Sequence, residues 1–250
     1  MIRILFIIFH LILCRTFLKI TYLQTVQLPL LNRTMDAFYY ESSSDEKRPG
    51  ILFLPDLTGV QKTTHKCAEI LREEGDYNVL IPDLYSGGSS LRKYCVQFLM
   101  NAIVRNNEPS GNEPLAEFFD ILDQFKEFQK VDGNNIGVVG QCLTGGFVLH
   151  AASRPEVKAP VVFHHSFGLK GSGIPKGCAS LIQHTVQGHF SYVDPMCPVW
   201  RVRQLATELE GKLESHWYNL PHGIPHLFFN NKQGKRAFER MSDFFREQLV

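Results

Sequence analysis

The sequence predicts an α/β fold, in which a mostly parallel central sheet is covered by helices on both faces. Continuous apolar runs, such as ILFLP (51–55) and NIGVVG (135–140), are typical of strands buried on both faces. Stretches with apolar residues at helical spacing separate these runs, and this alternation indicates βαβ units. Ligands bind such sheets at the carboxyl ends of the strands, so functional residues are expected directly after the apolar runs.

The first half of the expected domain begins with a hairpin. TVQLPLL (25–31) and MDAFYYE (35–41) are two short strands around a turn at Asn32 and Arg33. The buried strand 51–55 follows, then a helix over 62–74 that Gly75 ends, and then a second buried strand, YNVLIPD (77–83).

The second half continues the same alternation. Helical spacing predicts helices over 91–104, 113–129, 144–153, 199–210 and 234–249. Besides 135–140, apolar runs predict strands over 160–165, 180–188 and 213–220. We expect one domain over residues 25–250.

Residues 1–24 form an apolar N-terminal extension. The run from Ile4 to Cys14 is too short to span a bilayer but has the length of a signal-peptide core, and no small-residue cleavage site follows it. Two interpretations stay open: an extension from a misplaced start, or a signal-like segment of an exported protein. We favour the first, with a cytoplasmic location and no stable membrane span.

Composition and charge narrow the class of protein. Of 250 residues, 44% are hydrophobic and 20% charged, and the net charge of +1 gives no indication of a nucleic-acid partner. The six cysteines form no C-x-x-C pair, so neither a zinc ribbon nor a disulfide framework is expected. Nothing predicts the oligomeric state.

A thiol follows the strand 135–140 in the segment GQCLTGG (140–146). A strand that turns sharply into a helix, with a nucleophile at the bend and small residues around it, is a nucleophile elbow. Cys142 is therefore the candidate nucleophile, and the helix N-terminus favours its thiolate. Thr144 stands where glycine is most common. The alternative is that Cys142 is an ordinary buried thiol.

A thiol nucleophile needs a base and an acid that orients the base, and in hydrolase sheets they follow in the order nucleophile, acid, base. Asp194 lies in a turn after the strand near 180–188 and is the candidate acid, although Asp before Pro is also a common turn residue. His222 and His226 are both candidates for the base, and we favour His226. Gly223 and Pro225 between them argue against a helical zinc pair, and no metal is expected.

Further residues are expected around this triad. The backbone N–H groups of Leu143 and Leu57 are the candidate donors of an oxyanion hole. Asp56, Tyr85 and His165 follow strands and are expected to line the substrate pocket. For Asp56, a turn-forming role is an equal alternative.

Over about residues 25–248 the chain resembles the dienelactone hydrolases of the α/β-hydrolase superfamily. The resemblance rests on LFLPDLTGV, VLIPDLY, GVVGQCLTGG, the segment around Asp194, and PHLFF. It implies an α/β-hydrolase fold and a triad of Cys142, Asp194 and His226. It also implies hydrolysis of a small-molecule ester or lactone through a thioester, without a cofactor. Asp56 stands where the family usually has a Glu that controls the thiol.

The chain departs from that family at the arginines that hold the carboxylate of dienelactone. Ser86 and Asn230 stand at these two positions, and bidentate carboxylate binding is a task for arginine. Dienelactone itself is therefore in doubt as the substrate. A hydrolase-shaped binding protein without turnover is the alternative function.

Overall fold

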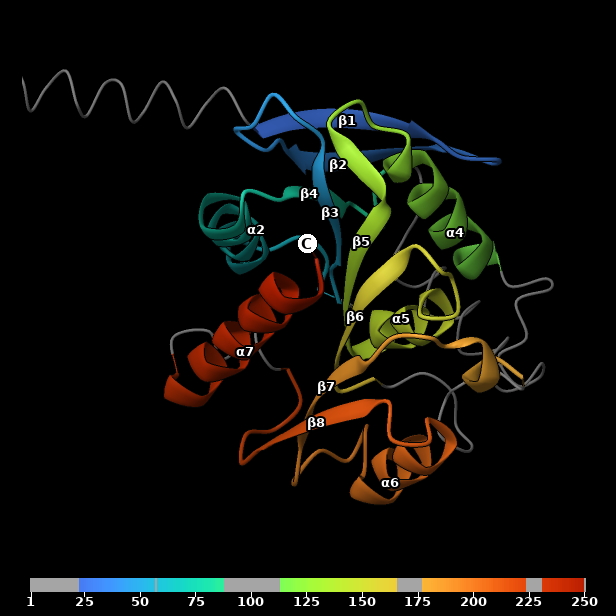
Figure 1. Cartoon of the computed structure of the whole chain (residues 1–250), viewed down its shortest axis with the longest axis vertical. Helices are drawn as coiled ribbons and strands as arrows, with labels where there is room; N and C mark the ends of the chain where they lie inside the picture. Colours follow the sequence, from blue (N-terminus) through green and yellow to red (C-terminus); the bar gives the residue numbers. More distant parts are fainter. Residues whose placement is uncertain (1–22, 57, 88–112, 166–176, 224–230, 250) are drawn as a thin grey trace, which may run out of the picture.

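The computed structural model describes residues 23–56, 58–87, 113–165, 177–223 and 231–249. The expected helix over 91–104, the N-terminal extension, Leu57, His226 and Asn230 lie outside these residues. The described part forms one eight-stranded sheet in the order β1-β2-β4-β3-β5-β6-β7-β8 (Figure 1). This mostly parallel sheet with helices on both faces confirms the predicted α/β-hydrolase fold.

The sheet begins with an antiparallel edge and continues as a parallel sheet. β1 (Leu23–Pro29) pairs with β2 (Thr34–Tyr40) as the expected hairpin, and β2 runs antiparallel to β4 (Asn78–Pro82). From β4 onward every neighbouring pair is parallel. The remaining strands are β3 (Arg48–Leu54), β5 (Val131–Gln141), β6 (Val157–Phe163), β7 (Val186–Ser191) and β8 (Leu213–Tyr218).

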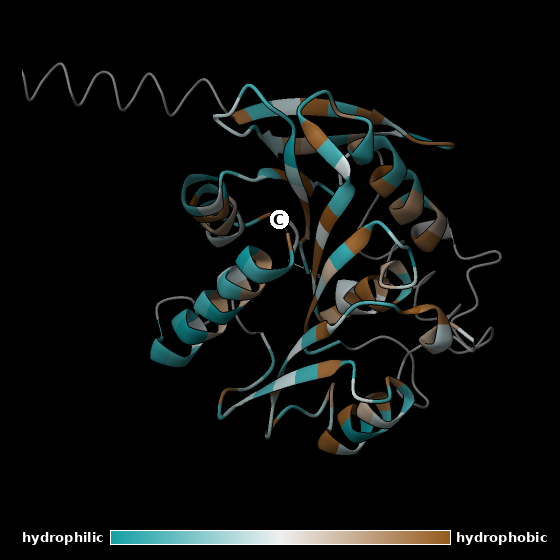
Figure 2. Cartoon of the chain, in the orientation of Figure 1, coloured by the Kyte–Doolittle hydropathy of each residue, from teal (hydrophilic) through white to brown (hydrophobic). Residues whose placement is uncertain are grey.

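Helices cover both faces of the sheet (Figure 1). One face carries α2 (Lys62–Gly75) and α7 (Lys232–Gln248), and the other carries α4 (Glu113–Lys126), α5 (Gly145–Ala151) and α6 (Val199–Glu208). Each face has its own apolar core, and Figure 2 shows apolar segments along the central strands. None of the helices in the described ranges is both long and apolar enough to cross a membrane.

One strand begins and ends later than its sequence predicts. The run 180–188 suggested a strand, but Ala179–Leu181 form a 3₁₀ turn in which the Leu181 side chain is 57% exposed. β7 instead begins at Val186 and continues to Ser191. Leu181 and Ile182 made the run look apolar before the strand begins, and Gly188 suggested an end that the strand passes.

The turn after β5 leaves no room for a side chain at Gly140. A Cβ at this position would lie 2.3 Å from the carbonyl oxygen of Thr144 and 2.7 Å from Cγ2 of Val148. Because the first contact is with backbone, Gly140→Ala is expected to lower the free energy of unfolding by about 3 kcal/mol, measured by urea denaturation. Gly177→Ala is the control, since a Cβ there meets nothing within 4 Å and adds only the smaller strain of a positive φ. Equal losses in both variants would contradict the steric explanation.

Candidate active site

Four neighbouring strands end at one edge of the sheet, and a reactive side chain follows each of them. Cys142 follows β5, His164 follows β6, Asp194 lies in the turn after β7, and His222 lies in the loop after β8. Because these strands are parallel and adjacent, their carboxyl ends meet, and residues far apart in the chain come together.

Cys142 lies at a strained bend of the backbone. Its φ is +57°, a left-handed conformation that costs a non-glycine residue roughly 1–3 kcal/mol and is concentrated at functional sites. Cys142 begins a 3₁₀ turn, Cys142–Thr144, which leads directly into α5. At the start of that helix, a Cβ on Gly145 would lie 3.0 Å from Cα of His165, so glycine lets α5 approach the end of β6 closely. The geometry is that of a nucleophile elbow.

Thr144 holds this elbow together. Its buried hydroxyl accepts the N–H of Gln141 at 2.9 Å and lies within 3.1 Å of the carbonyl oxygens of both Gln141 and Pro55. Pro55 follows β3 and begins the loop that contains Leu57. The threonine at a position where glycine is common therefore joins the turn of Cys142 to the loop after β3.

Asp194 and His222 form a hydrogen-bonded pair. Oδ2 of Asp194 lies 2.7 Å from Nδ1 of His222, and the carboxylate side chain is fully buried. Oδ1 accepts the backbone N–H groups of Met196 at 2.8 Å and Cys197 at 3.1 Å. Burial alone would raise the pKa of Asp194, but these hydrogen bonds and the charge of His222 hold the pKa below its usual value.

His222 interacts with both Asp194 and Cys142. Nδ1 faces a carboxylate and so carries a proton, which leaves the buried Nε2 for Cys142. Burial lowers the pKa of His222, but hydrogen bonds and charge interactions with Asp194 and Cys142 outweigh it and raise the pKa to about 9. The imidazolium form of His222 is therefore favoured at neutral pH.

Two loops are tied together where they carry this pair. The hydroxyl of Ser191, at the end of β7, donates a hydrogen bond to the carbonyl oxygen of Leu220 and accepts the N–H of Val193 at 3.1 Å. The N–H of Tyr192 donates to the carbonyl oxygen of Tyr218 at 3.1 Å. These bonds hold the loop of Asp194 against the loop of His222. Sequence reasoning did not single out Ser191, because a serine at a strand end is common.

The other predicted residues fall into different surroundings. Leu143 follows Cys142 in the turn and is buried. Asp56 is also buried, and its Oδ1 accepts the backbone N–H of Thr58 at 2.8 Å and the Thr58 hydroxyl at 2.6 Å, as in a turn carboxylate. Tyr85 is half-buried and packs over Gly59.

His165 is enclosed by other parts of the chain. It is fully buried, and Nδ1 lies 3.7 Å from Sγ of Cys197. Burial and the nearby charges of Asp194 and Cys142 raise the pKa of Cys197 to about 12, so this second thiol near the site stays protonated. Sequence reasoning did not place Cys197 here, because no spacing pattern connects it to Cys142.

Three of these residues could also hold a metal ion. Ligand atoms of His164, Asp194 and His222 lie within 4.8 Å of one another. However, Nδ1–H of His222 faces Asp194, and Nε2 of His164 accepts the backbone N–H of Gly223 at 3.1 Å. These two nitrogens are already engaged in hydrogen bonds, which argues against metal binding through them.

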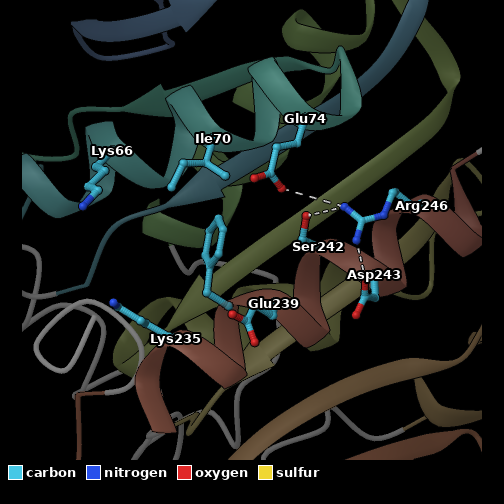
Figure 3. Close-up of a pocket in the computed structure, with 9 residues that line it drawn as sticks. Lys66, Ile70, Glu74, Lys235, Glu239, Ser242, Asp243 and Arg246 are labelled. Carbon is cyan, nitrogen blue, oxygen red and sulfur yellow. Dashed lines mark hydrogen bonds and ion pairs between the residues drawn. The ribbon is translucent and has the colours of Figure 1, made fainter. Parts of the chain in front are cut away.

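A surface hollow elsewhere lies between α2 and α7 (Figure 3). Arg246 in this hollow lies 3.9 Å from Glu74 and pairs with Asp243, and its Nη1 donates to the Ser242 hydroxyl at 3.1 Å. Its charged groups are of both signs and largely neutralise one another. None of them belongs to the strand ends that carry Cys142, Asp194 and His222.

Comparisons with known proteins identify the family of the chain. The model of the dienelactone hydrolase family matches residues 35–249. A Synechocystis sp. protein provisionally named carboxymethylenebutenolidase is 21% identical over 243 residues, which cover 90% of this chain and 96% of that protein.

Solved structures share the fold. A provisionally assigned dienelactone hydrolase from Klebsiella pneumoniae superimposes with a TM-score of 0.71 at 19% identity, covering 90% of this chain and 98% of that one. The dienelactone hydrolase-like promiscuous phosphotriesterase P91, from metagenomic libraries, gives a TM-score of 0.73 at 17% identity, with 91% and 98% covered.

Proposed function

Since the chain belongs to the dienelactone hydrolase family, and is thus an ester or lactone hydrolase, we propose that it acts on a small molecule through a triad of Cys142, Asp194 and His222. The observation that carries the proposal is the contact of 2.7 Å between the buried carboxylate of Asp194 and His222, the histidine that also interacts with Cys142. His222 takes the role that the sequence favoured for His226.

The first half of the reaction forms a thioester. The Cys142 thiolate, with the His222 imidazolium beside it, attacks the substrate carbonyl carbon. The developing oxyanion accepts hydrogen bonds from the backbone N–H groups of Leu143 and Leu57, and one such donor contributes roughly 3 kcal/mol to lowering a barrier. As the carbon–oxygen bond breaks, His222 donates its proton to the departing alkoxide.

The second half restores the enzyme. Neutral His222 takes a proton from a water molecule, whose oxygen attacks the thioester carbon. The tetrahedral intermediate then expels the Cys142 thiolate, and the acid is released. Asp194 stays ionised throughout, keeps the ring in one orientation and stabilises its charged form.

The residues around Ser86 support a substrate that has no carboxylate near Ser86. Within the described residues, Arg33 reaches this loop, and its guanidinium donates to the carbonyl oxygens of Ser86 and Leu84. The same guanidinium lies 2.8 Å from Glu117, and both side chains are largely buried. Arg33 is therefore engaged within the protein, and we propose uncharged esters or lactones as the substrate class.

Selective alkylation tests the proposed nucleophile. At neutral pH, iodoacetamide is expected to modify Cys142 at least about tenfold faster than Cys67 or Cys197, because it reacts with thiolates. Burial raises the pKa of both other thiols to about 12. Peptide mass spectrometry follows each site, while hydrolysis of p-nitrophenyl acetate is recorded in the same samples.

The two readouts separate the alternatives. Loss of activity in parallel with Cys142 modification supports the proposal, and Cys178→Ala is the control that keeps both signals, because Cys178 is only half-buried and belongs to no strand end. Rapid labelling of Cys142 without any hydrolysis across ester and lactone substrates would instead favour the binding protein. Slow labelling of Cys142 would contradict the thiolate.

A further inference from the structure

We propose that His164 is a positioning residue that holds the loop of His222, and this inference rests on the proposed function. His164 directly follows β6, and its side chain is fully buried. Its backbone N–H donates to the carbonyl oxygen of His189 at 2.9 Å, which fixes it against β7. The residue has a φ of +37°, an unusual conformation for a non-glycine residue.

His164 contacts His222 in two ways. The two rings pack with centroids 4.1 Å apart and planes at 56°. Nε2 of His164 also accepts the backbone N–H of Gly223, the residue after His222, at 3.1 Å. His164 thus holds His222 in place through ring packing and through a hydrogen bond to the peptide group that follows it.

The loop of His222 needs such a hold. Gly223 has a φ of +112°, a conformation that favours glycine, so the chain immediately after the base has intrinsic freedom. On the other side, Ser191 binds the carbonyl oxygen of Leu220. Ser191 and His164 therefore bind the residues on both sides of Pro221 and His222, and the ring orientation depends on both contacts.

The hydrogen bond also fixes the protonation of His164. A ring nitrogen that accepts an N–H must be unprotonated, so neutral His164 carries its proton on Nδ1. A charged His164 would lose the Gly223 contact and repel the imidazolium of His222. The titratable groups that face the pair are Asp194, His189 and Cys142, and His165 follows His164 in the chain.

Variants that remove the acceptor test the role. Phe at 164 keeps a ring, Met fills the space with a flexible chain, and Gln places an oxygen near the position of Nε2. None of the three is β-branched, so none adds the strain that a β-branched residue would have at this positive φ. In His164→Phe and His164→Met, kcat/KM for p-nitrophenyl acetate is expected to fall about 10- to 100-fold, as expected when a catalytic group is displaced by about 1 Å. The alkaline limb of the pH profile, set by His222, is expected to move to lower pH, because contacts with Asp194 and Cys142 weaken. His164→Gln is expected to stay within about threefold of the parent and to keep the limb.

Controls separate positioning from folding. His150→Phe replaces another buried histidine, on α5, and is expected to leave the alkaline limb unchanged. Melting temperatures show whether His164→Phe and His164→Met are folded, and the result is taken from a variant that is folded. A parent-like profile in that variant, or equal damage in His164→Gln, would overturn the inference. Cys142→Ala is measured alongside: if it keeps full activity, the proposed function itself fails, whatever position 164 does.

Discussion

Alanine at position 222 is expected to lower kcat/KM for an activated ester by at least about 10³-fold, whereas alanine at position 226 changes it by less than about tenfold. The reason is the contact of 2.7 Å between Nδ1 of His222 and the buried carboxylate of Asp194. Without the ring, Cys142 loses the group that accepts its proton, and the leaving alkoxide loses its proton donor. Asp194 would in addition be left buried without its charged partner.

Initial rates with p-nitrophenyl acetate measure both variants, and the double variant Cys142→Ala/His222→Ala adds a sharper test. Residues that act as one unit show strongly non-additive losses. The kcat/KM of the double variant is therefore expected to be no lower than that of the less active single variant. Circular dichroism confirms that each variant is folded. A large loss at 226 with a small one at 222 would assign the base to His226 and contradict the triad proposed here.

The two candidate histidines show which signal the sequence lacks. The order nucleophile, acid, base predicted that a histidine follows the last strand, and two were present four residues apart. The aromatic residues after His226 favoured it, because packing would fix its ring. The contact that distinguishes His222 joins residues 28 positions apart across two loops, and no local pattern encodes it.

The fold was predictable for a different reason. Apolar runs and helical spacing are local signals, and they located the strands and helices to within a few residues in most of the described chain. The start of β7 was misplaced because Leu181 is an exposed apolar residue just before the strand. Burial, which distinguishes such a residue from a strand residue, depends on tertiary packing.

Thr144 shows why a departure from a motif is hard to interpret from sequence. At the sequence level the hydroxyl and methyl groups only added bulk to an elbow where glycine is usual. In the folded chain the hydroxyl satisfies the N–H of Gln141 and lies within hydrogen-bonding distance of the carbonyl oxygen of Pro55, so the added group stabilises the turn that carries Cys142.

Asparagine at position 194 is expected to lower kcat/KM by about 10⁴-fold, the size seen when the acid of a Ser-His-Asp triad is replaced in this way. The amide keeps the shape of the carboxylate, and its oxygen can still accept the N–H groups of Met196 and Cys197. Its NH₂ group, however, can donate to Nδ1 of His222. That contact would place the ring proton on Nε2, the nitrogen that must accept the proton of Cys142.

In the same variant, the alkaline limb of the pH profile is also expected to move to lower pH. In the parent protein the imidazolium of His222 is lost as the pH rises through about 9, so kcat/KM is expected to decline above that value. In Asp194→Asn, burial opposes the charged ring and only Cys142 supports it, so the pKa of His222 falls and the decline begins at lower pH. Rates from about pH 5 to about pH 10 locate this limb. Asp132→Asn is the matched control. Asp132 is a turn carboxylate at the amino end of β5, far from the site, and it accepts the backbone N–H of the nearby Asn134 at 3.2 Å. Without a charged partner, His222 would have a pKa below the ordinary histidine value near 6.5, because burial lowers it. A limb that stays at the parent pH in Asp194→Asn would therefore mean that another group raises the pKa of His222.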